Sequence, residues 1–189
     1  MSLSICVFCG AAVGVRPAYA EAARATGLAI AQRGWTLVYG GGRIGLMGIL
    51  ADAALEAGGR VVGVMPRFLY EREVAHTNLS ALELVDGFAA RKARMGELAG
   101  AYLSLPGGVG TMDEMFEAWS WTQARLEDKP SVLLDVDGYY ASLVEFLDRA
   151  VDQGFIKPES RSTLRVGDDI HALLGHVAKL AGGRHRAPR

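Results

Sequence analysis

The sequence has no long apolar run and no excess of charge of either sign. No stretch reaches the roughly 20 apolar residues that a membrane-spanning helix needs, and the first residues, MSLSICVFCG, lack the charged leader and cleavage site of a signal peptide. Lysine and arginine number 20 against 21 aspartate and glutamate, so no general field collects nucleic acid or acidic lipid. We therefore expect a cytoplasmic protein without a nucleic-acid or membrane partner, in which any anion is recognised locally.

Cysteine is also scarce, and the two that occur, Cys6 and Cys9, form a C-x-x-C pair. A redox pair of this spacing normally begins a helix, whereas this segment is apolar and strand-like, so that positions three apart face opposite sides. A zinc site would need four ligands, and the histidines show no ligand spacing. We expect two buried structural thiols and no metal site.

Two nucleotide-binding signatures are missing or incomplete. The G-x-x-x-x-G-K-[ST] loop of P-loop proteins does not occur. GGGRIG at 40–45 matches G-x-G-x-x-G, but it follows the second expected strand, and the next strand ends in Met65 and Pro66 without an acidic residue to hold a dinucleotide ribose. These glycines either only allow a tight turn with close helix packing or form a wall of a mononucleotide pocket. We favour the wall, with Gly42 as a ligand contact.

What the sequence does contain is an alternation of β-rich apolar runs with alanine-rich amphipathic segments. Strands whose sequences are nearly continuous apolar runs are typical of a parallel sheet with helices on both faces. The length of 189 residues suits one domain. We predict a Rossmann-like, doubly wound α/β domain over residues 1–181 and a disordered tail at 182–189. The expected strands are 4–8, 35–39, 60–65, 82–85, 101–105, 131–136 and about 163–166, and the expected helices are 17–33, 44–58, 88–99, 111–126, 139–153 and 168–181.

On such a fold, the loops that follow the strands meet at one edge of the sheet, where ligands bind. Four segments would meet there: CGAAVG at 9–14, GGGRIGLMG at 40–48, the start of the helix bearing Arg91 and Lys92, and PGGVGT at 106–111. With the usual strand order 3-2-1-4-5, the first and fourth strands would flank the crevice. The basic pair and the last glycine loop would then be neighbours.

PGGVGTMDE at 106–114 is the most specific of these segments. Pro106 ends a strand, the glycines let main-chain N–H groups turn toward one point, and Thr111 would begin a helix whose free amides favour a phosphate. Glu114 admits two interpretations. It completes a T-x-x-E capping box with Thr111, or it faces the ribose of a bound nucleotide, where a carboxylate supports the oxocarbenium-like transition state of glycosidic cleavage.

The helices on either side of this loop carry further expectations. Met112, Met115, Phe116 and Trp119 have helical spacing and should face the core. Arg91 stands near a helix start, where the dipole disfavours cations, and so has reason to meet a phosphate or carboxylate. We assign the nearby Arg94 to a solvated face.

Three motifs together resemble the LONELY GUY family of cytokinin riboside 5′-monophosphate phosphoribohydrolases, some of which were once labelled lysine decarboxylases. PGGVGTMDE matches P-G-G-x-G-T-x-x-E, RKARM at 91–95 matches R-K-x-x-M, and GGGRIGLMG matches G-G-G-x-x-G-L-M-G. With CVFCG, VDGYY and GFIKP, the resemblance runs over about residues 3–181. It implies a homodimer that hydrolyses the N-glycosidic bond of AMP-type nucleotides to a purine base and ribose 5-phosphate, without metal or organic cofactor.

The motif positions imply roles for individual residues. Arg91 and Glu114 correspond to the catalytic pair, and an Arg-Glu-Val element at 72–74 adds Glu73 as a nucleotide contact. The other expected substrate contacts are Lys92, Gly107, Gly108, Val109, Gly110, Thr111, Gly10 and Gly42.

The chain departs from the family pattern at two places. Phe88-Ala89-Ala90 stands where the family commonly has M-H-x, and Ala11-Ala12 stands in place of two serines. Either change can alter which base is accepted or how fast it is released. A non-catalytic nucleotide- or phosphosugar-binding protein would use the same loops, because fold does not dictate function, whereas a NAD-dependent oxidoreductase is disfavoured by the missing acidic residue.

Overall fold

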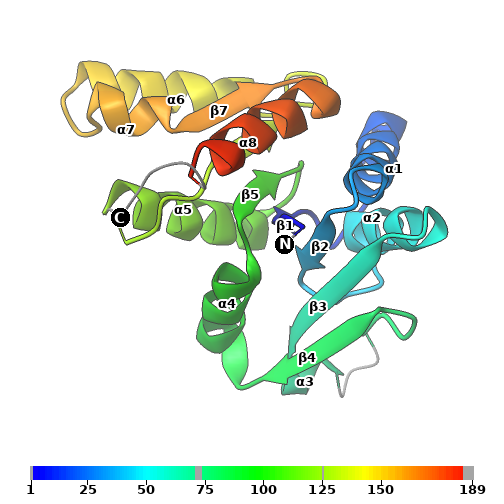
Figure 1. Cartoon of the computed structure of the whole chain (residues 1–189). Coiled ribbons are helices and arrows are strands. Elements are labelled where there is room, and N and C mark those ends of the chain that lie inside the picture. Colours follow the sequence, from blue (N-terminus) through cyan, green and yellow to red (C-terminus); the bar gives the residue numbers. More distant parts are fainter. Residues whose placement is uncertain (1, 71–73, 125, 185–189) are drawn as a thin grey trace.

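The computed structural model of the chain describes residues 2–70, 74–124 and 126–184. Its centre is a parallel sheet of seven strands with helices on both faces, which confirms the Rossmann-like α/β prediction (Figure 1). The strands are β1 Ser4–Phe8, β2 Thr36–Tyr39, β3 Arg60–Pro66, β4 Ala81–Val85, β5 Ala101–Ser104, β6 Ser131–Leu134 and β7 Leu164–Gly167. The helices are α1 Pro17–Gln32, α2 Gly45–Glu56, α3 Arg67–Tyr70, α4 Gly87–Leu98, α5 Val109–Gln123, α6 Ala141–Asp152, α7 Pro158–Ser162 and α8 Ile170–Arg184.

The helices differ from the prediction in a few places. The two short helices α3 and α7 were not expected. Helix α8 continues to Arg184, so that the backbone of residues 182–184 is helical where a disordered tail was expected, and residues 185–189 lie outside the described ranges. Among the described helices, none has the length and apolar character needed to cross a bilayer.

The strand order β4-β3-β2-β1-β5-β6-β7 differs from the expected 3-2-1-4-5. The fourth strand lies at the edge beyond β3, and β5 pairs with β1 instead. The burial of the two strands explains the exchange: every residue of β5 is buried, as a central strand requires, whereas β4 is only half-buried along its length. Glu83 in the middle of β4 also suits an edge strand, because it remains partly accessible to water and pairs with Arg94.

In this order the chain adds strands on one side of β1 up to β4 and then on the other side from β5 onward. The topological switch point of the sheet, where ligands bind in such folds, therefore lies between β1 and β5. Helix α4 then crosses back from the edge toward the centre, and it contacts β3, β2 and β1 on the way. Because α4 runs in this direction, Arg91 lies beside the central loops and not at the edge of the sheet. The basic pair and the last glycine loop are therefore neighbours, as expected, although strand four does not flank the crevice.

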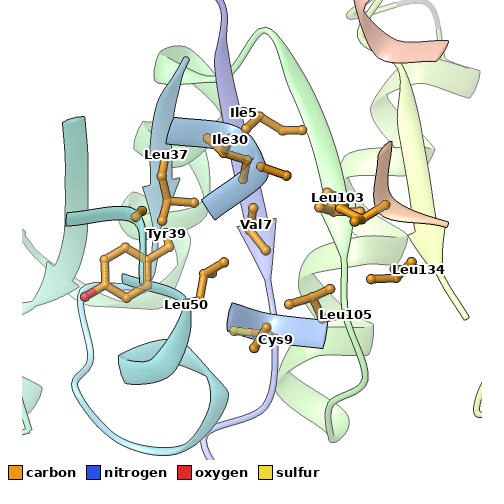
Figure 2. Close-up of a cluster of buried hydrophobic side chains, with 14 of the residues drawn as sticks. Ile5, Val7, Cys9, Ile30, Leu37, Tyr39, Leu50, Leu103, Leu105 and Leu134 are labelled. Carbon is orange, nitrogen blue, oxygen red and sulfur yellow. The ribbon is translucent and has the colours of Figure 1, made fainter. Parts of the chain in front are cut away.

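Two apolar cores, one on each face of the sheet, hold these elements in place. Helices α1, α2 and α8 cover one face, where Ile30 and Leu50 pack against Val7 and Leu37 (Figure 2). Helices α4, α5 and α6 cover the other face. Each fully buried Leu or Ile side chain contributes about 1.5–3 kcal/mol to folding.

The two cysteines belong to different cores, with Cys9 on the first face and Cys6 on the second. Both are buried free thiols, which confirms the expected burial. Burial raises the pKa of both thiols well above the ordinary value, so they remain protonated and unreactive at neutral pH.

Helix α5 packs on the second core with a stripe that differs from the prediction at one position. Met115 and Trp119 are buried as expected, and Met112 is half-buried. Phe116 was expected in the core but is 37% exposed, and Ala118 is buried instead. The stripe follows positions i, i+3 and i+4 from Met115, and Phe116 lies one residue off that line.

Candidate active site

Three loops meet at the switch point with almost no side-chain atoms between them. The Gly10 N–H donates to the Pro106 carbonyl at 3.1 Å, and the Leu46 N–H donates to the Gly10 carbonyl at 3.0 Å. A Cβ on Gly107 would lie 2.9 Å from the Gly10 main-chain nitrogen, and a Cβ on Gly45, where φ is +60°, would lie 2.2 Å from the Ala11 carbonyl carbon. Any larger residue at these two glycines would force the loops apart.

Helix α5 begins at Val109, two residues before the expected start. Gly108 is its N-cap residue, and no side chain of the described residues caps the helix. The capping-box interpretation of Thr111 and Glu114 is therefore wrong. The first amides of the helix are left available for an anion, which is the arrangement that favours phosphate at a helix N-terminus.

Glu114 pairs with Arg91 of helix α4 instead. The Arg91 Nη2 atom lies 2.7 Å from Glu114 Oε1, and each side chain is only 12% exposed. Burial raises the pKa of Glu114 above the ordinary 4.5, although the neighbouring Arg91 opposes the shift. Within the described residues, the buried Nε atom of Arg91 has no hydrogen-bond partner. Such orphaned donors are costly and are characteristic of functional sites.

Gly40 brings the end of strand β2 into contact with this pair. A Cβ at Gly40 would lie 2.3 Å from Arg91 Nη2, so the guanidinium occupies the space that a side chain would need. On another side, the Phe88 ring lies 6.0 Å from the Arg91 guanidinium carbon, within cation–π range. The position of Arg91 therefore depends on the absence of a side chain at Gly40 and on the contact with the Phe88 ring.

Lys92 is engaged by two carboxylates of helix α5. Its Nζ atom lies 2.9 Å from Asp113 Oδ2 and also pairs with Glu117. The hydrogen bond to Glu117 is the main reason that the pKa of Lys92 is raised. The ammonium therefore ties α4 to α5 beside the Arg91–Glu114 pair. Arg94, two residues further on, pairs with Glu83 and Glu97 and is not simply solvated.

These groups line a pocket of about 640 Å³ whose lining is partly charged and partly apolar. Its charged residues are Arg91, Lys92, Asp113 and Glu114, which line it together with residues 108–111 of the glycine loop and the helix start. Its large apolar residues are Ile44, Met47, Leu69, Val74, Phe88 and Val109. The combination fits a ligand that has an anionic end and a flat apolar end.

Most of the expected site residues come together in this pocket. Arg91, Glu114, Lys92, Gly108, Val109, Gly110, Thr111 and Gly42 all line it. Gly10 and Gly107 border the adjoining cavity of about 380 Å³. The expected contact Glu73 lies outside the described residues. Gly40 and Phe88 were not among the expected site residues, although Gly40 belongs to the GGGRIGLMG segment and Phe88 stands at one departure from the family pattern.

Comparisons with known proteins show the family to which the chain belongs. The family model described as "Possible lysine decarboxylase" matches residues 47–177. A cytokinin riboside 5′-monophosphate phosphoribohydrolase from Arabidopsis thaliana is 45% identical over 83% of this chain and 72% of its own. A phosphoribohydrolase of the same name from Rhodococcoides fascians is 45% identical over 92% of this chain and 88% of its own. The chain belongs to the LONELY GUY family.

A solved structure shows how far the fold of this LONELY GUY chain is shared. The molybdenum cofactor carrier protein from Chlamydomonas reinhardtii matches it with a TM-score of 0.70 over 96% of this chain and 99% of the carrier. The two are 22% identical, so the likeness concerns the fold alone. Function follows from the pocket and from the LONELY GUY relatives.

Proposed function

We propose that the chain hydrolyses the N-glycosidic bond of purine nucleoside 5′-monophosphates, such as AMP and its cytokinin-type relatives, and releases the free base and ribose 5-phosphate. The observation that carries the proposal is the buried Glu114–Arg91 pair beside an uncapped helix N-terminus in one pocket. The relatives named as phosphoribohydrolases over most of the chain support the same reaction.

The charged and apolar groups that line the pocket indicate how a nucleotide is held. The 5′-phosphate lies on the amides of residues 108–111, where the dipole of α5 adds to the hydrogen bonds. Glu114 stands five residues beyond Val109, about 7.5 Å along the helix axis, which leaves room for the pentose between phosphate and carboxylate. The purine then rests against the apolar side chains of the lining.

The reaction follows from this placement. The bond between C1′ and the purine nitrogen breaks, and its electron pair leaves with the base, which takes up a proton. Positive charge develops on the ribose, where the carboxylate of Glu114 stabilises it. The oxygen of a water molecule bonds to C1′, and Glu114 accepts a proton from that water and releases it to solvent, which balances the proton that the base takes up from solvent. Arg91 orients Glu114 and favours its ionised form.

The first test is Glu114→Gln, assayed by adenine release from AMP. We expect kcat to fall by about 10²–10³-fold or more, because the amide can neither stabilise the cation nor accept the proton. Glu97→Gln, an exposed carboxylate on α4, serves as the control and should stay close to wild type. Calorimetry with AMP separates the rival function: a wild-type protein that binds AMP but releases no adenine would be a binding protein.

The pH profile of the wild type gives a second readout of Glu114. Because the pKa of this carboxyl is raised above 4.5, the ionised form is lost as the pH falls through that higher value. The acid limb of kcat/KM should therefore lie above pH 4.5. An acid limb below that value would contradict the buried carboxylate as the group that must be ionised.

We further propose that the chain is a one-domain unit that works as a homodimer in the cytoplasm. Phe88 on α4 and Phe116 on α5 support this proposal, because both aromatic rings are exposed at the surface of the chain. Cell fractionation tests the location, and recovery in a membrane or secreted fraction would contradict it.

A further inference from the structure

Tyr139 lies outside the catalytic pocket but bonds to the loop that forms it. It belongs to the segment between β6 and α6, and its Oη atom donates to the carbonyl oxygen of Gly107 at 2.6 Å. With Gly107 and Gly108 it borders the adjoining cavity, whereas of these three residues only Gly108 lines the catalytic pocket. The hydroxyl therefore reaches the glycine loop from the adjoining cavity and not from the catalytic pocket.

Because of peptide-bond geometry, this contact fixes the direction of a main-chain N–H group that lines the pocket. No cis peptide occurs in the described residues, so the Gly107–Gly108 unit is trans and planar. In a trans peptide the C=O and N–H groups point in opposite directions. When Tyr139 holds the Gly107 carbonyl, the Gly108 N–H must point away from Tyr139. Glycines on both sides of this bond leave the peptide plane free to rotate without such a hold.

The surroundings of Tyr139 keep its hydroxyl in place. Its ring packs edge-to-face against Tyr19, with centroids 5.7 Å apart, and against Tyr140, with centroids 5.0 Å apart. Asp137, two residues earlier, pairs with Arg16 at 3.5 Å, which adds a second tie between this loop and the start of α1. The donor is therefore positioned before any ligand arrives.

We propose that Tyr139 is a positioning residue that aims the Gly107–Gly108 peptide so that the Gly108 N–H donates to the 5′-phosphate of the substrate. The inference rests on the proposed function and adds a residue to which no role has been given. The phosphate does not react, so this bond is made equally in the ground state and the transition state. Loss of the bond should raise KM and leave kcat nearly unchanged.

Tyr140 provides a matched control within the same segment. Its Oη atom donates to the Leu105 carbonyl, also at 2.6 Å, but this carbonyl lies before the loop and the tyrosine is 1% exposed. Tyr140→Phe removes the same kind of bond from the end of strand β5. It should lower the melting temperature, because a buried acceptor loses its donor, without weakening phosphate binding.

The experiment compares Tyr139→Phe with Tyr140→Phe. For Tyr139→Phe we expect the KM for AMP and the calorimetric Kd for ribose 5-phosphate each to rise about tenfold, the effect of one misaligned charge-assisted bond. The kcat should stay within about threefold, and the melting temperature should change less than in Tyr140→Phe, because the ring and its contacts remain. Tyr140→Phe should bind ribose 5-phosphate as the wild type does.

Three results would overturn the inference. They are an unchanged Kd for ribose 5-phosphate in Tyr139→Phe, an equal loss of affinity in Tyr140→Phe, and a wild type that does not bind ribose 5-phosphate. Failure of the proposed function gives a different pattern: the wild type then binds ribose 5-phosphate but releases no adenine. In that case the calorimetric comparison still decides the role of Tyr139.

Discussion

At the scale of single residues, the position of Arg91 depends on a glycine that lies 51 positions earlier in the chain. The guanidinium fills the space beside Gly40, 2.3 Å from where a Cβ would be. The displaced atom would be the end of a flexible side chain, so the fold can accommodate an alanine there by moving Arg91. The catalytic pair cannot accommodate that movement, because misplacement by about 1 Å can cost 10²-fold in rate.

Gly40→Ala should therefore separate activity from stability. We expect kcat/KM for AMP to fall by about 10²-fold while the melting temperature changes little. Gly175→Ala in α8 is the control, because a Cβ there meets nothing within 4 Å and a helical alanine is favoured over glycine. Full activity in Gly40→Ala would show that Arg91 does not need the position seen here.

The sequence allowed Arg91 and Glu114 to be predicted but not the contact that places them. A helix start disfavours cations, so an arginine there pointed to a partner, and three glycines before an acid pointed to an anion site. No local pattern indicates which side chain approaches Gly40. That contact forms because α4 packs against β2, and this packing is a tertiary contact that the local sequence does not reveal.

At the scale of elements, local helix signals were outweighed by tertiary contacts. Thr111 and Glu114 have the spacing of a capping box, yet α5 starts at Val109 and Glu114 turns to Arg91. A capping contact is worth about 1 kcal/mol, whereas an uncompensated buried arginine would cost about 3–5 kcal/mol. The pairing with Arg91 therefore decides the orientation of Glu114, and no analysis of the helix alone could have found this.

The tie between α4 and α5 can be tested with a double-mutant cycle on Lys92→Met and Glu117→Gln. Because one ammonium holds both carboxylates, we expect a coupling energy of about 0.5–3 kcal/mol in denaturant unfolding. Both single variants should raise the KM for AMP by similar factors, since both loosen the same helix pair. A KM increase in Lys92→Met alone, without coupling, would instead indicate the direct nucleotide contact that the sequence predicted.

At the scale of the whole molecule, the layers and the parallel sheet were predictable, but the strand order was not. The alternation of apolar runs and amphipathic segments indicates a parallel sheet without saying which strand is central. Glu83 within LELV was the available signal, because a charge in the middle of a strand suits an edge. The exchange of the fourth and fifth strands puts β4 at the edge and β5 beside β1.

The proposed homodimer makes a prediction at this scale. Sedimentation at micromolar concentration should give about twice the chain mass of 20.1 kDa. Phe116→Asp should shift the protein toward monomer, because it places a charge on an exposed aromatic position of α5. Phe155→Asp, which changes an 88% exposed ring between α6 and α7, is the control and should leave the dimer intact. A wild type that sediments as a monomer would contradict the proposal.

The central place of β1 has a consequence for how the protein is made. Its two neighbours are β2, which comes early in the chain, and β5, which comes much later. During translation at roughly 5–20 residues per second, the edge of β1 that will pair with β5 has no partner strand for several seconds after β2 has emerged. The nascent polypeptide therefore presents an unsatisfied strand edge to chaperones and to other chains, and enzymatic competence arises only when that gap has been closed.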